Sequence, residues 1–207
     1  MHTEALAPKT KKAFELLGTV EMIQQFYLAG GTAAALYLGH RFSHDLDFFS
    51  TQRFDSELLR LELEKVGNLA IEFKKKDTLL GKFNGVKISF FYYPYPLIQP
   101  LAYFDSVAIT NQKDIAAMKI NAIAGRGIKR DFIDLYSLME ANHWRLIEVI
   151  AWFMKKYKKS NYNMVHVLNA LIYFEDADKT PIPKMIKPLD WEKVKHYFRS
   201  AVKAIEL

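Results

Sequence analysis

Apolar and polar residues alternate along much of the first half of the chain, whereas the second half repeats its apolar residues at helical spacing. The alternation predicts extended runs, which we place at 26–29, 45–49, 70–75, 78–83 and 86–93. Asn84-Gly85, between the last two runs, is typical of a hairpin turn. Helical spacing in the same half predicts helices at 9–24, 33–38 and 55–66.

Prolines at positions 94, 96 and 100 interrupt regular structure, and we place a domain boundary after them. From residue 111 onward the pattern predicts helices at about 112–124, 129–141, 144–157, 163–175 and 190–205. The chain is therefore expected to be an α+β protein. Residues 1–110 would form the α+β domain, and residues 111–207 would form a helical domain.

The composition is that of an ordinary globular chain. Of the 207 residues, 50% are hydrophobic and 25% are charged, which argues against disorder. Cysteine is absent from the sequence, so disulfides, thiolate metal sites and cysteine nucleophiles are excluded. No run of 18 apolar residues occurs, and residues 1–12 are too charged for a signal peptide. We expect a cytoplasmic protein with no membrane association.

The positive charge is concentrated in the second half of the chain. Residues 1–110 hold twelve cations and twelve anions, while residues 111–207 hold seventeen cations and eleven anions, which accounts for the net charge of +6. Such an excess favours a polyanionic partner, a nucleotide or a nucleic acid. A solvated basic surface that keeps the protein soluble is the alternative.

Two aspartates carry the most specific candidate chemistry. Asp45 and Asp47 lie in a predicted strand, where side chains two residues apart share a face, while Leu46 and Phe48 point to the core. Their Cα atoms would be roughly 6–7 Å apart. Two carboxylates at this spacing can share a hard cation, and Mg²⁺ prefers oxygen ligands. A solvated strand end is the alternative for the pair taken alone.

A pair of glycines precedes these aspartates. Gly30 and Gly31 lack a Cβ and allow close approach of a ligand, and the helix that follows favours a phosphate at its N-terminus. We expect Thr32 to cap that helix. A purely structural turn is the alternative for the glycines, but the combination with Asp45 and Asp47 favours a nucleotide site.

The order of these motifs resembles that of a known family. Gly-Gly-Thr, a short helix and Asp-x-Asp are together similar to the DNA polymerase beta-like nucleotidyltransferase superfamily. Segments 29–32, 39–49 and 114–135 resemble the AbiEii/AbiGii toxin family within it. The resemblance implies a mixed sheet with helices and transfer of a nucleotide from an NTP with magnesium. It also implies a paired antitoxin protein, and family members studied as toxins act on tRNA or bind GTP.

One position departs from the superfamily pattern. Its members usually supply a third carboxylate from a later strand, and the matching residue of this chain is Ser89. A neutral hydroxyl is a poor magnesium ligand, and the superfamily's acid commonly helps to activate the attacking hydroxyl. The departure leaves metal binding plausible and puts ordinary transfer chemistry in question.

A second polar cluster lies in the helical half. Lys119 borders the apolar stripe of one helix, and Arg126, seven residues later, lies on a similar side of that helix. Asp131 and Asp134 share a face of the next helix. A partly buried ion-pair network between the two helices is one explanation. The resemblance favours the other, in which Lys119 contacts triphosphate oxygens and Asp131 or Asp134 is a catalytic carboxylate.

Two further groups have open interpretations. Arg41 and Ser43 could contact a phosphate, or Arg41 could pair with Asp45 and brace the turn. The segment 155–162 places four lysines near two tyrosines, which suits a nucleic-acid backbone or a solvated helix end. His40 and His44 have a zinc-like spacing, but Gly39 interrupts the helix that this spacing would need.

The sequence thus predicts a magnesium-dependent nucleotidyltransferase that moves a nucleotide from an NTP to a tRNA-like RNA or a protein acceptor. Asp45 and Asp47 would hold Mg²⁺, while Gly30, Gly31, Thr32, Arg41, Ser43 and Lys119 would bind the nucleotide. Two other functions fit the same residues. The chain could be a binding module for a nucleotide or RNA that has lost catalysis, or a metal-dependent phosphodiesterase or nuclease.

Overall fold

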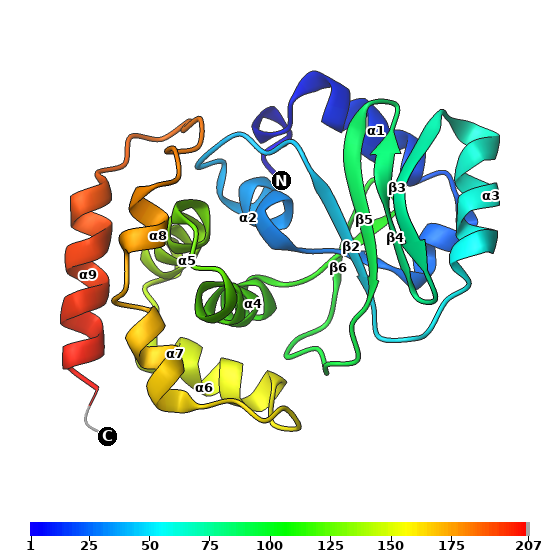
Figure 1. The fold of residues 1–207 in the computed structure, drawn as a ribbon. Coiled ribbons are helices and arrows are strands. Elements are labelled where there is room, and N and C mark those ends of the chain that lie inside the picture. The colour runs from blue at the N-terminus through cyan, green and yellow to red at the C-terminus, as the bar shows by residue number, and fades with distance from the viewer. Residues whose placement is uncertain (206–207) are drawn as a thin grey trace.

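A seven-stranded mixed sheet forms the centre of the molecule. The computed structural model describes residues 1–205 and orders the strands β3-β4-β5-β2-β1-β7-β6 (Figure 1). The strands are β1 (Tyr27–Leu28), β2 (Leu46–Ser50), β3 (Leu69–Lys75), β4 (Thr78–Phe83), β5 (Val86–Tyr92), β6 (Ala102–Phe104) and β7 (Val107–Ile109). Two pairs, β2 with β5 and β1 with β7, are parallel, and the others are antiparallel. The predicted α+β class with a mixed sheet is confirmed.

The hairpin of β4 and β5 forms where the sequence predicts it. Asn84 and Gly85 both have positive φ, +49° and +78°, as a two-residue turn of this kind requires. The sequence analysis did not predict β6 and β7. Each strand is only three residues long, and the pairing of β7 with β1 depends on residues about 80 positions away.

Helices cover one face of the sheet and connect it to the second half of the chain. They are α1 (Pro8–Leu17), α2 (Gly30–Leu38) and α3 (Ser56–Val66), with short 3₁₀ helices at Thr3–Ala5 and Glu21–Gln25. α3 packs on β3 and β4, α1 packs on β5, and α2 lies between the sheet and the later helices (Figure 1). Asp55 caps α3 by accepting hydrogen bonds from the N–H groups of Glu57 and Leu58.

The predicted continuous helix over residues 9–24 is wrong. α1 ends at Leu17 because Gly18 passes very close to a distant segment, where an added Cβ would lie 2.6 Å from the Asp105 carbonyl oxygen. The chain then turns before the 3₁₀ helix at Glu21–Gln25. The tight packing of Gly18 against the β6–β7 turn thus divides the segment.

The second half is helical, as the sequence predicts. It comprises α4 (Gln112–Gly125), α5 (Lys129–Asn142), α6 (Leu146–Lys156), α7 (Met164–Ala170), α8 (Glu175–Asp178) and α9 (Trp191–Lys203). The helix predicted over 163–175 is shorter, because α7 ends at Ala170 and α8 is a separate turn. α4 packs against α2, α5, α6 and α7.

One hydrophobic cluster includes residues from both halves, among them Leu28 of β1 and Ile115 of α4. The division at residue 110 stays a prediction. None of the helices within residues 1–205 combines the length and apolar character needed to cross a bilayer.

Candidate active site

A cleft of about 1090 Å³ lies between the sheet and the helical half. One wall carries Asp45 and Asp47 at the start of β2, together with Ser89 of β5. The opposite wall carries Lys119 of α4 and Arg126 at the end of that helix. The predicted nucleotide-binding residues Gly30, Gly31, Thr32, Arg41 and Ser43 also line this cleft. Residues far apart in the chain therefore meet around one space.

The strand pattern directs the two cleft aspartates as predicted. Leu46 and Phe48 are fully buried in the core, while Asp45 and Asp47 are partly exposed and line the cleft. Within residues 1–205, neither carboxylate accepts a hydrogen bond or forms an ion pair. Two unpaired carboxylates on one face are the oxygen donors that Mg²⁺ prefers, so the donor set fits this ion.

Ser89 lies directly beside this pair. In the parallel ladder of β2 and β5, Ser89 is the partner of Asp47. The hydroxyl thus occupies the position on the neighbouring strand from which a third acid side chain would reach the same space. The chain offers two carboxylates and one hydroxyl there.

The two glycines have separate roles. Gly30 has a φ of +68°, and a Cβ there would lie 3.4 Å from Oδ2 of Asp47. A Cβ on Gly31 would lie 2.2 Å from Nη2 of Arg41. Gly30 thus allows the left-handed turn that starts α2, and Gly31 makes room for the guanidinium.

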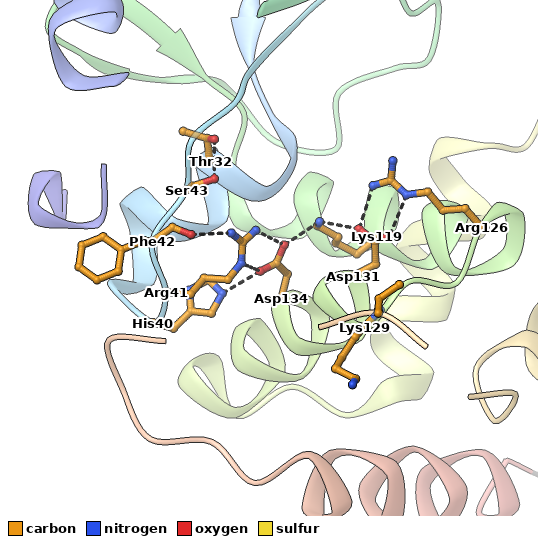
Figure 2. Close-up of polar contacts among 11 residues, drawn as sticks. Thr32, His40, Arg41, Phe42, Ser43, Lys119, Arg126, Lys129, Asp131 and Asp134 are labelled. Atoms are coloured by element: carbon orange, nitrogen blue, oxygen red, sulfur yellow. Dashed lines mark hydrogen bonds and ion pairs between the residues drawn. The ribbon is translucent and has the colours of Figure 1, made fainter. Parts of the chain in front are cut away.

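Asp134 is the centre of a buried charge network at the back of the cleft (Figure 2). Its carboxylate accepts hydrogen bonds from Nε of Arg41 at 2.6 Å and from Nη2 of Arg41 at 2.9 Å. Nε2 of His40 lies 2.8 Å away and Nζ of Lys119 lies 2.7 Å away. Burial raises the pKa of Asp134, but Arg41 and Lys119 outweigh it and hold that pKa well below its usual range.

Asp131 extends the network to the end of α4 (Figure 2). It accepts a hydrogen bond from Nζ of Lys119 at 2.9 Å and two from Arg126, at 2.8 and 3.1 Å. Burial opposes ionisation of Asp131, but Lys119 and Arg126 lower its pKa. The buried acids therefore fix three cations, Arg41, Lys119 and Arg126, which all line the cleft.

Comparison with known proteins agrees with this geometry. The model of the family described as "Nucleotidyl transferase AbiEii toxin, Type IV TA system" matches residues 14–95. The uncharacterized protein aq_aa25 of Aquifex aeolicus is 39% identical over 202 residues, which cover 96% of each chain. The chain belongs to the AbiEii nucleotidyltransferase toxin family. It is accordingly a nucleotidyltransferase.

Two solved structures from Helicobacter pylori share the fold of this AbiEii family member. JHP933 has a TM-score of 0.53 and 15% identity, and the match covers 96% of this chain and 92% of that one. A second protein, described as a candidate nucleotidyltransferase, also has a TM-score of 0.53 and 15% identity, with 95% and 94% covered. At this identity the likeness concerns the fold.

Two sequence-based expectations for this AbiEii protein need correction. The expected pairing of Arg41 with Asp45 is wrong, because the guanidinium is bound by Asp134 of α5. Thr32 is not the cap of α2, since the helix begins at Gly30 after Ala29. The Thr32 hydroxyl instead donates to the Asp45 carbonyl oxygen and lies 2.8 Å from the Ser43 hydroxyl, which braces the approach to β2.

The basic segment 155–162, for which a nucleic-acid patch and a solvated helix end were both open, is only partly exposed. Lys156 is buried and donates to Oδ1 of Asp114 at 2.5 Å and to the Pro96 carbonyl oxygen at 3.0 Å. Tyr157 is buried as well, and its hydroxyl bonds to that of Tyr93. One cation and one ring therefore belong to the core, because α6 closes over the loop that carries Pro96.

For Asp131 and Asp134 the structure favours the ion-pair network over the cleft carboxylate. Both are fully buried behind Lys119 and do not line the cleft. In this arrangement they position cations. The role of Lys119 toward a triphosphate stays a prediction, and its place in the cleft wall is compatible with it.

Several cleft residues were missed by the sequence analysis. Arg130 of α5 and Lys184 line the cleft, and Lys184 lies in a strap formed by residues 179–190. The strap reaches the cleft by backbone pairing, since Phe42 donates to the Lys184 carbonyl oxygen and Ile186 donates to that of His40, both at 2.9 Å. No local signal in the sequence could have identified this pairing across more than 140 residues.

Proposed function

We propose that this protein is a cytoplasmic, magnesium-dependent enzyme that transfers a nucleotide from an NTP to a tRNA-like RNA or a protein acceptor. The observation that carries the proposal is the unpaired Asp45–Asp47 pair, which lines the same cleft as three fixed cations. A nucleoside triphosphate with a divalent ion needs both groups. The acids can hold the ion, and the cations can bind the phosphates.

The chain's own residues would contribute mainly by positioning and electrostatics. Asp45 and Asp47 would hold Mg²⁺, which when bound offsets charge on the phosphates. Gly30 and Gly31 leave the backbone open to the triphosphate, and Lys119 is held so that its ammonium can face the leaving pyrophosphate. Because Asp131 and Asp134 fix the cations beforehand, little reorganisation is needed when substrate binds.

The physiological role that we propose is that of the toxin in a toxin–antitoxin pair. Family membership supports a nucleotide substrate and an antitoxin protein as partner. Expression of the chain alone should slow growth of a bacterial host, and the Asp47→Asn variant should not. Equal growth with both proteins would contradict a toxic activity.

The direct test is transfer of label. Purified protein is incubated with each α-labelled NTP, Mg²⁺ and total tRNA, with the Asp47→Asn variant as a control. We expect label in RNA for at least one NTP with the wild-type protein alone. No label in RNA or protein under any NTP would overturn the enzymatic part of the proposal.

A second function, nucleotide or RNA binding without catalysis, is favoured by one observation. The position beside Asp47 is occupied by Ser89 and not by a carboxylate. Thermal shift separates this function from loss of the whole site. A pure binding module should be stabilised by an NTP with Mg²⁺, should lose this stabilisation in Asp47→Asn, and should transfer no label.

A further inference from the structure

A single row of side chains crosses four strands from the acid pair to the edge of the sheet. Asp47 pairs with Ser89, Ser89 pairs with Leu80, and Leu80 pairs with Phe73. Residues paired in this way point to the same face of the sheet. With strands about 4.8 Å apart, Phe73 lies roughly 14 Å from Asp47 along this row.

The row becomes more exposed toward the edge of the sheet, because Ser89 is buried, Leu80 is half-buried and Phe73 is exposed. Ser89 and Leu80 line the cleft, and Phe73 of the edge strand β3 is 48% exposed. The ladder shifts register between Ile71 and Phe73, so the edge strand bulges at this point. Nζ of Lys75 lies 5.8 Å from the centre of the Phe73 ring. The row therefore ends in an exposed aromatic ring with a cation above it.

Strands β3, β4 and β5 carry a local positive charge, although the net charge of residues 1–110 is zero. Residues 69–92 contain five lysines and two acids. Both acids are paired, Glu72 with Lys82 at 3.4 Å and Asp77 with Arg53. A second lysine, Lys74, pairs with Glu57. In the part of the chain that the structure describes, Lys75, Lys76 and Lys87 have no carboxylate partner.

We propose that this face of β3, β4 and β5 binds the single-stranded end of an RNA acceptor and leads it to Asp47. The inference rests on the proposed function and assigns the acceptor's path. The terminal nucleoside lies over Ser89 and Leu80, a preceding base stacks on Phe73, and Lys75 and Lys87 face the backbone phosphates. An aromatic ring beside lysines is the combination that binds single-stranded nucleic acid without reading its sequence.

The geometry separates this acceptor surface from the nucleotide site. The glycines follow β1, which flanks β2 on one side, and the row runs over β5, β4 and β3 on the other side of β2. The cleft of about 1090 Å³ lies at the upper end of the range for ligand pockets, roughly 300–1,000 Å³. In the proposed arrangement the nucleotide and the RNA end approach the acid pair from different strands.

The test compares two exposed aromatic residues on opposite edges of one sheet. Phe73→Ala removes the proposed stacking ring, and Tyr103→Ala on β6, where the side chain is 73% exposed, is its matched control. Lys87→Glu reverses the charge of the cleft lysine, and Lys11→Glu does so for an exposed lysine of α1. Binding of a labelled single-stranded RNA oligonucleotide is measured by fluorescence anisotropy.

We expect Phe73→Ala to weaken RNA binding about ten-fold, within the range that stacking of one base on an aromatic ring gives. Lys87→Glu should also weaken it and reduce its salt dependence. Both controls should bind like wild type, and the thermal shift produced by NTP and Mg²⁺ should be unchanged in Phe73→Ala and in the two controls. Photocrosslinking of an RNA with a photoreactive 3′ uridine should label peptides of β3, β4 or β5.

Equal RNA binding by Phe73→Ala and Tyr103→Ala, or crosslinks confined to the helical half, would overturn the inference. Label transfer to protein but not to RNA would overturn it as well, while the transferase function would stand. If no label is transferred to any acceptor, the proposed transferase function fails, which is an outcome distinct from failure of the acceptor path. Since Phe73 is exposed, its variant should fold, and an unchanged melting temperature verifies this.

Discussion

Two pairs of aspartates in this protein have the same chemistry and opposite surroundings. Asp45 and Asp47 are partly exposed, face a cleft and have no cation partner within residues 1–205. Asp131 and Asp134 are fully buried, and each is bound by two or more basic side chains. The first pair is open to a ligand, and the second pair is already neutralised by the protein.

The difference shows how surroundings assign roles to identical side chains. A buried carboxylate must be paired, and pairing leaves it unable to bind a metal ion. An exposed pair can remain ionised without a protein partner because water solvates it. Exposed acids can therefore bind substrate and metal, while buried acids hold the cations that face them.

The largest effect should come from removing charge at the cleft. Asp47→Asn should lower the transfer rate about a thousand-fold, because a metal ligand is lost from the reacting centre. The melting temperature without Mg²⁺ should stay the same or rise slightly, since two like charges no longer repel. Label transfer and thermal denaturation measure the two quantities. A lower melting temperature in Asp47→Asn together with an unchanged transfer rate would contradict this prediction.

The buried pair should show the opposite pattern. Asp134→Asn leaves Arg41 and Lys119 without a full counter-charge, and breaking such a buried pair costs about 3–5 kcal/mol of stability. The melting temperature should fall by roughly 10 °C. The exposed pair Glu62–Lys65 gives a control, and Glu62→Gln should leave the melting temperature unchanged. A wild-type melting temperature in Asp134→Asn would show that the network contributes nothing to stability.

Acid should destabilise the protein through the same network. The pKa of Asp134 is well below its ordinary value of 3.8 in the folded protein, so its contribution is fully present above that value. It is lost as the pH falls below 3.8 toward the folded-state pKa, because the unfolded chain then binds the proton first. Unfolding free energy against pH should fall less steeply in Asp134→Asn than in wild type. Parallel curves would exclude this group as the cause.

A smaller effect tests how the network reaches the cleft. Gly31→Ala places a methyl group 2.2 Å from Nη2 of Arg41 and must displace the guanidinium. We expect a loss of about 1–3 kcal/mol in stability and a weaker thermal shift with NTP. Gly125→Ala is the control, since no atom lies within 4 Å of its added Cβ, and it should stabilise the end of α4 slightly. Similar behaviour of the two variants would contradict the assigned role of Gly31.

The smallest effect is expected at the neighbour of Asp47. Ser89→Asp adds a third carboxylate to the cleft, which should lower stability slightly without a divalent ion and tighten Mg²⁺ binding several-fold. Melting temperature against Mg²⁺ concentration measures both effects. Ser89→Asn is the neutral control and should behave like wild type. If both variants respond to Mg²⁺ equally, the carboxylate does not reach the ion.

Local pattern was sufficient for the parts of the fold that local contacts determine. The hairpin around Asn84-Gly85 and the alternation that directs Asp45 and Asp47 depend on neighbours a few residues away. The strands β6 and β7 are too short for a periodic pattern. The end of α1 depends on Asp105, nearly 90 residues further along the chain, so the sequence near Gly18 could not reveal it.

The candidate site divides in the same way. The residue types of the charge network were predictable from helical spacing, but the partner of Arg41 was not, because Asp134 lies 93 positions away. The two acids of the helical half could be either ligands or partners until their burial was known. Lys184 and the strap gave no signal at all, since only backbone pairing with residues 40 to 42 brings them to the cleft.

The strap of residues 179–190 determines at what point during synthesis the cleft can form. During synthesis the acid pair, the glycines and the helices with the fixed cations all leave the ribosome before residues 180 to 187, which pair with the loop ahead of Asp45. A nascent or truncated chain that ends before Thr180 lacks the part of the cleft lining that the strap supplies. The complete cleft thus forms only after the chain has been synthesised past residue 187.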